Sequence, residues 1–99
     1  MTPSNTLPKQ EFIKHSCEQI LRFTRVSKWD ELSEERKVQL GFNMGVMALG
    51  LGLSKEEGFI ALSDVRDGRM SMERFHEHIE EIVLFKGIVV DRAKVEREF

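Results

Sequence analysis

Residues 38–53, VQLGFNMGVMALGLGL, form the most apolar stretch of the chain and decide the fold that we expect. If this stretch winds as a helix, apolar side chains cover two opposite sides of it, and only Arg36, Gln39 and Asn43 leave a narrow polar strip. One side carries Val38, Phe42, Val46, Leu49 and Leu53, and the other carries Leu40, Met47 and Leu51. A helix that is apolar nearly all round is typical of a protein interior. We therefore predict a central helix over about residues 33–52 that its neighbours cover.

Small residues recur within this stretch, at Gly41, Gly45, Ala48 and Gly52. Each glycine costs a helix roughly 1 kcal/mol relative to alanine, so the pattern predicts that another backbone comes close. Two interpretations stay open: a dense single-chain core, or a surface that a second copy or another protein covers. For the second interpretation, the expected partner or dimer interface consists of Phe12, Phe23, Gly41, Met44, Gly45, Met47 and Ala48.

The composition is that of one soluble globular domain, with 99 residues, 40% of them apolar and 32% charged. A formal net charge of −2 gives no general attraction to nucleic acid or to an anionic membrane. Cys17 is the only cysteine, so no intrachain disulfide is possible, which fits a reducing compartment. The apolar run is shorter than the roughly 20 residues that span a bilayer, and residues 1–10 lack the pattern of a signal peptide. We expect a cytoplasmic protein without membrane contact.

Residues 1–7 show no periodicity and are predicted to be a flexible lead-in to a single helical domain over 8–99. A first helix is predicted from Pro8 to about Val26. Its apolar stripe consists of Phe12, Ile13, Cys17, Ile20, Leu21, Phe23 and Thr24. We expect its other face, which includes Glu18, to be solvated.

Local end signals divide the rest of the chain. Ser33 is a helix cap followed by two acids, and Ser54-Lys-Glu-Glu57 is a capping box that begins a third helix. The turn dipeptide Asp67-Gly68 ends that helix, Ser71 caps a fourth, and Gly87 ends or kinks it. For residues 88–99 we favour a last short helix over an edge strand. The predicted fold class is all-α: a compact bundle of four to five short helices around the central apolar helix.

Segment 63–74 resembles the latter half of a calcium-binding EF-hand loop, in which Asp-Gly-x-hydrophobic-Ser precedes the exiting helix. In that register, loop positions 1, 3 and 12 are Ser63, Val65 and Arg74, so three of the usual oxygen donors are missing. A corner between two helices explains the segment better than a calcium site.

Two fragments resemble parts of helix-turn-helix repressors. GLSKEEGFIAL, residues 52–62, is similar to the start of their second helix, and residues 67–71 are similar to the turn after the recognition helix. The base-reading helix that the family places between these parts is missing. Arg66, Arg69 and Arg74 could still meet phosphates, which position a protein without reading sequence. A nucleic-acid-associated regulator is therefore an alternative function.

Glu73-x-x-His76 has the spacing by which one helix offers two ligands to a metal in di-iron bundles. Such sites need a second pair, and the first helix offers only His15-x-x-Glu18, in reversed order. A metal-binding bundle at Glu73 and His76 is the third hypothesis, and we expect no cofactor.

No catalytic residues are predicted, because the sequence has no nucleophile–histidine–acid signature and no phosphate-binding glycine loop. The favoured hypothesis is a small non-enzymatic regulatory protein, of bacterial or phage type. It would act by docking on another protein, as a homodimer.

Overall fold

The protein is described by a computed structural model that covers residues 6–26 and 28–96. The helices are α1 (Thr6–Val26), α2 (Glu34–Leu51), α3 (Ala61–Arg66), α4 (Met72–Lys86) and α5 (Arg92–Glu96). A 3₁₀ turn, η2 (Trp29–Glu31), precedes α2, and a π-helical turn, η3 (Glu56–Ile60), leads directly into α3. The described residues contain no strand, so the predicted all-α bundle is confirmed.

The helix starts follow the predicted capping signals. The side chain of Ser33 accepts a hydrogen bond from a first-turn amide of α2 at 3.2 Å, and that of Ser71 does the same for α4 at 3.0 Å. Ser54 and Glu57 form the reciprocal bonds of a capping box, at 3.0 and 3.2 Å. Each of these bonds joins residues three positions apart, so the sequence predicts them without knowledge of the tertiary fold.

Helices α2 and α4 each end at a glycine with positive φ. Gly52 has φ +66° after α2, and Gly87 has φ +72° after α4. A side chain is strained in this conformation, so glycine is favoured there. Beyond Gly87, α5 confirms the favoured helix at residues 92–96, while residues 97–99 and most of the predicted lead-in, 1–5, lie outside the described residues.

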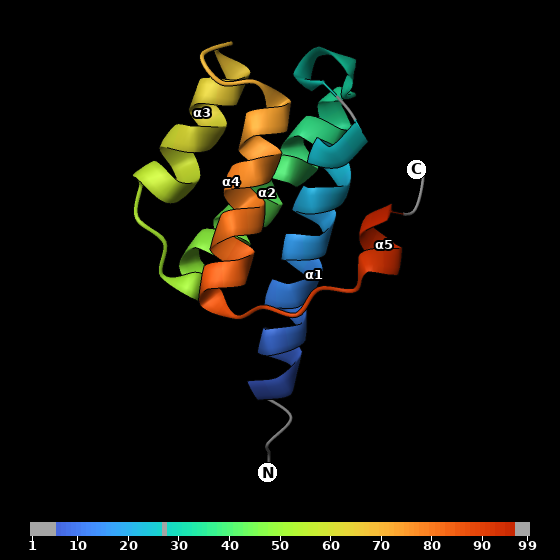
Figure 1. Cartoon of the computed structure of the whole chain (residues 1–99), viewed down its shortest axis with the longest axis vertical. Coiled ribbons are helices and arrows are strands. Elements are labelled where there is room, and N and C mark those ends of the chain that lie inside the picture. Colours follow the sequence, from blue (N-terminus) through green and yellow to red (C-terminus); the bar gives the residue numbers. More distant parts are fainter. Residues whose placement is uncertain (1–5, 27, 97–99) are drawn as a thin grey trace.

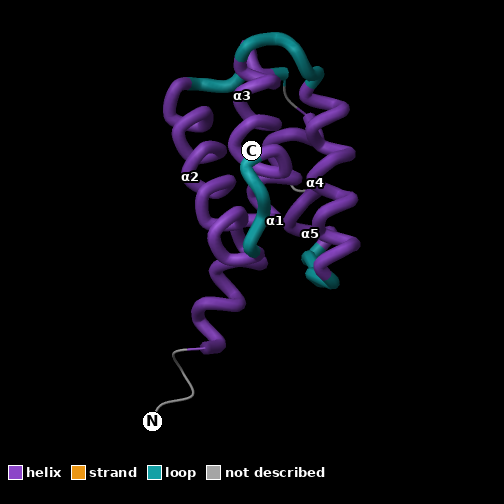
Figure 2. Tube along the Cα trace, turned by 90° about the vertical axis from the view of Figure 1, so that its left-hand side faces the viewer, coloured by secondary structure: helices purple, strands orange, loops and turns teal. Residues whose placement is uncertain are grey.

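The helix at the centre of the bundle is α1. It packs against α2, α4 and α5 (Figure 1), and α2 and α4 lie on either side of it (Figure 2). The core consists mainly of Cys17, Ile20 and Leu21 from α1, Leu40, Met44 and Met47 from α2, and Phe75, Ile79, Ile82 and Val83 from α4. The segment 33–52 therefore does not hold the central place that we predicted, because only one side of it faces this core.

A buried carboxylate attaches the C-terminal segment to α1. Glu18 is 1% exposed and accepts a hydrogen bond from the Asp91 amide at 2.6 Å. The Arg25 guanidinium donates to the carbonyls of Val95 and Glu96 at 3.3 and 2.8 Å. The prediction that Glu18 is solvated was wrong, because the connector to α5 covers it.

Candidate functional site

One side of α2 lies in the core of the bundle, and the other side is exposed to solvent. The side toward α1 fully buries Leu40, Met44 and Met47. On the other side, Val38, Phe42 and Leu49 are 70%, 62% and 84% exposed. Their spacing of i, i+4 and i+11 puts them in one stripe along the helix, with Gly45 between Phe42 and Leu49. We call this stripe the outer face of α2.

The outer face continues onto η3. Phe59 and Ile60 of η3 are about half exposed, and a hollow of about 310 Å³ lies between η3, α3 and α2. The hollow is lined by Trp29, Gly41, Phe59, Leu62, Ser63 and Arg66. No residue from Val38 to Ser54 is charged. The result is an apolar surface that is uncharged along α2, with a depression beside Gly41 that Arg66 also lines.

The glycines of α2 and η3 differ in how much space an added side chain would have. A Cβ atom added at Gly41 or Gly45 would have no neighbouring atom within 4 Å. At Gly50 it would lie 2.6 Å from a side chain of α1, and at Gly58 of η3 it would lie 3.3 Å from the Cβ of Ala48. Within the described chain, the predicted close approach of another backbone to Gly41 and Gly45 is therefore absent.

The residues predicted for a partner or dimer interface fall into two groups. The chain's own core covers Phe23, Met44, Met47 and Ala48. Phe12 of α1 is half exposed, and Gly41 and Gly45 are accessible in part. A partner would have to displace packed elements to reach the first group, so Val38, Phe42 and Leu49 replace it as candidates.

The three arginines of the nucleic-acid hypothesis pair with carboxylates. Arg66 bonds Asp67 at 3.1 Å, Arg69 bonds Asp67 and Asp64 at 3.1 and 3.0 Å, and Arg74 lies 3.5 Å from a glutamate of α4. The hydrogen bond from Arg66 is the largest of the effects that lower the pKa of Asp67. A phosphate at this corner would have to displace carboxylates, so the arginines do not form an open basic patch.

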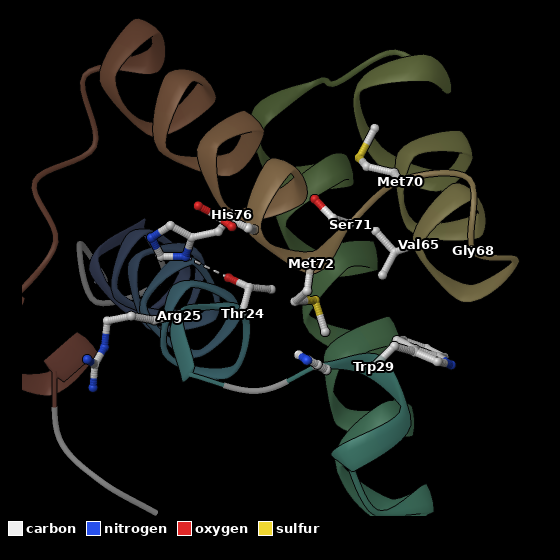
Figure 3. A pocket seen from close by; sticks show the side chains of 11 residues that line it. Thr24, Arg25, Trp29, Val65, Gly68, Met70, Ser71, Met72 and His76 are labelled. Carbon is white, nitrogen blue, oxygen red and sulfur yellow. Dashed lines mark hydrogen bonds between the residues drawn. The ribbon is translucent and has the colours of Figure 1, made fainter.

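A larger hollow, of about 690 Å³, lies between the C-terminal end of α1 and the start of α4. Figure 3 shows Thr24 and His76 turned toward each other at this hollow, while Arg25 points away toward α5. The Thr24 hydroxyl donates to the Ile20 carbonyl at 2.8 Å, so it must accept its bond of 2.8 Å from Nδ1–H of His76. The hydroxyl proton points at a carbonyl rather than at the imidazole, so this pair is not arranged as a nucleophile and its base.

The described residues offer no third ligand to a metal at His76 and Glu73. The remaining ring nitrogen of His76 lies 3.9 Å from Glu80, whose carboxylate is held by Arg92 at 3.0 and 3.1 Å. Burial is the largest of the effects that lower the pKa of His76. The described part of the chain contains no group of three histidine, cysteine or acidic side chains that could hold a metal.

Cys17 offers no nucleophile, because burial raises the pKa of its thiol to about 11. Among the described residues, no helix is both long enough and apolar enough to cross a membrane. Comparison with known protein families, curated proteins and solved structures finds no match for this chain. The proposal for its function therefore depends on the exposed surface itself.

Proposed function

We propose that this protein is a small, non-enzymatic docking module of the cytoplasm, and that it binds an apolar helix of another polypeptide on the outer face of α2. One observation carries the proposal. The exposed parts of Val38, Phe42, Leu49, Phe59 and Ile60 together leave roughly 600 Å² of surface open, which lies at the upper end of the about 300–600 Å² that the largest apolar patch of a typical monomer covers, and such patches are often functional.

The shape of this surface suits a helix. The stripe from Val38 to Leu49 runs about 16 Å along α2, which corresponds to about three helical turns. The depression at Gly41 beside Phe59 provides a recess for a side chain of the partner. Recognition of an amphipathic helix by an apolar groove uses anchors at this kind of spacing.

The energetics favour association. A fully buried valine, leucine or phenylalanine side chain contributes about 1.5–3 kcal/mol relative to its exposed state. No residue from Val38 to Ser54 is charged, so burial of the outer face of α2 leaves no charge there without a partner, and Arg66 at the depression is paired with Asp67 at 3.1 Å. Loss of translational and rotational freedom offsets part of this gain.

A peptide titration tests the proposal. The probe is a fluorescent helical peptide with leucine at i, i+4, i+7 and i+11 and glutamine elsewhere, and binding is followed by anisotropy. We expect the double variant Phe42→Glu, Leu49→Glu to weaken binding at least tenfold, because it places two charges in the contact.

The matched control is Leu84→Glu, Phe85→Glu, which places the same charges on exposed apolar positions of α4. This variant should bind like the original protein. Equal affinities for both double variants, or no binding by the folded original protein at a concentration at which it is a monomer, would contradict the proposal. Circular dichroism of each variant verifies that the helices are intact.

A further inference from the structure

We infer that the helix that docks on the outer face is α2 of a second copy of this chain, packed antiparallel about a two-fold axis beside Gly45. This inference depends on the proposed function, because it names the partner of the same surface. It follows from the self-complementary shape of α2, from the position of its charges, and from the area available.

The shape argument starts from Leu49, which is 84% exposed and is the most exposed large apolar side chain of α2. Leu49 lies four residues after Gly45, and Gly41 lies four residues before it. A two-fold axis at Gly45 therefore brings Leu49 of each copy to the level of Gly41 in the other copy.

At that level the surface has a hole for a side chain. Residues at i, i+3, i+4 and i+7 border a hole on a helix, as in knobs-into-holes packing. Here they are Val38, Gly41, Phe42 and Gly45. Two of the four borders have no side chain, and no atom lies within 4 Å of the positions that their Cβ atoms would take. The hole is open toward the hollow that Phe59 lines, so a leucine has room to enter.

The charges favour antiparallel over parallel helices. Glu34 and Glu35 lie in the first turn of α2, and the helix has no charged residue after Lys37. Parallel copies would place Glu35, and Glu34 with its partner Lys37 at 3.3 Å, against their counterparts, and the two helix dipoles would be aligned side by side. Antiparallel copies separate the acids to opposite ends of the interface and oppose the dipoles. The uncharged stripe between them does not repel a copy of itself.

The area is close to that of a stable interface. Each copy offers roughly 600 Å² of exposed apolar side chains, and a standard interface buries about 800 Å² per partner. Polar atoms at the rim of α2 and η3 would supply the difference.

A cysteine cross-link tests the arrangement. In Gly45→Cys the added Cβ meets no atom of its own chain, so the fold should be unchanged. Cys17 is fully buried, which leaves the new thiol as the reactive one. A disulfide requires Cα atoms about 4.4–6.8 Å apart, which only a site near the axis provides. We expect sedimentation to show a dimer of the original protein, and mild oxidation to link most of the Gly45→Cys chains into dimers.

Glu73→Cys is the matched control, because it places an exposed thiol on α4, away from the outer face. It should cross-link at least tenfold more slowly, and urea should slow Gly45→Cys to the same rate. A second test exchanges knob and hole. Leu49→Ala and Gly41→Leu should each weaken the dimer about tenfold, and the double variant should recover most of the loss.

The outcomes separate this inference from the proposed function. If sedimentation shows that the original protein is still a monomer at about 100 µM and this monomer binds the probe peptide, the inference is overturned and the docking proposal stands. A dimer in which Gly45→Cys cross-links no faster than Glu73→Cys also overturns the inference. A protein that neither dimerises nor binds the peptide overturns both.

Discussion

Helix α2 is apolar on two faces. Its inner face, which carries Leu40, Met44 and Met47, lies in the core, whereas its outer face is exposed to solvent. Met44 and Met47 on the side toward the core are fully buried, whereas Phe42 and Leu49 on the outer face are mostly exposed. Hydrophobic residues on both faces predict that both are covered. The difference teaches that a pattern of this kind does not tell which face the chain covers itself and which is left for another molecule.

The largest expected effect comes from the inner face. Met44→Ala should lower the free energy of unfolding by about 2–5 kcal/mol, because it leaves a cavity in the core. The matched change Phe42→Ala should alter it by no more than about 0.5 kcal/mol in dilute solution, because the side chain is mostly in water. Urea denaturation followed by circular dichroism gives both values. Similar losses for the two variants would mean that the faces do not differ.

The second effect concerns the glycine that α2 packs against. Gly58 is buried, with Ala48 3.3 Å from the position of an added Cβ. Gly58→Leu should therefore cost about 1–3 kcal/mol of stability through overpacking. The same denaturation experiment measures the loss, and a Gly58→Leu protein as stable as the original would show that η3 moves freely over α2.

The sequence predicted what depends on near neighbours. Ser33, Ser54 and Ser71 start their helices through bonds to residues three positions away, and Gly87 ends α4 through its own conformation. These features led to the correct all-α fold class. The stripe of α1 that includes Ile20 was also predicted, because its other side is polar and only one orientation buries it.

Contacts between distant residues were not predictable in the same way. Thr24 and His76 are separated by 52 positions, and Glu18 and Asp91 by 73. Nothing in the residues around Glu18 indicates that a connector will cover it. The choice of face on α2 is also a tertiary effect, because it depends on which side meets α1. This is why the sequence placed Met44 in the interface and overlooked Val38 as a candidate.

A third, smaller effect has the opposite sign. Gly45→Ala should raise the free energy of unfolding of the dilute protein by about 0.5–1 kcal/mol, because alanine is the better helix former and its Cβ meets open space. Thermal or urea unfolding at low protein concentration measures the gain. A loss of stability would mean that the chain itself already packs against Gly45.

The smallest effect is a change with pH in the free energy of unfolding that self-association should not share. Because burial lowers the pKa of His76, the folded state disfavours the protonated ring relative to the unfolded state. The unfolded chain therefore binds more protons as the pH falls below the ordinary histidine value of about 6.5, and the free energy of unfolding should decrease over that range. His76→Gln should reduce this slope.

The outer face has no ionisable side chain from Val38 to Ser54, so its contribution to self-association should stay constant over the same pH range. Urea titrations and sedimentation at pH 5.5 and 7.5 measure the two quantities, and a dimer that weakens in parallel with the fold would place titratable groups in the interface.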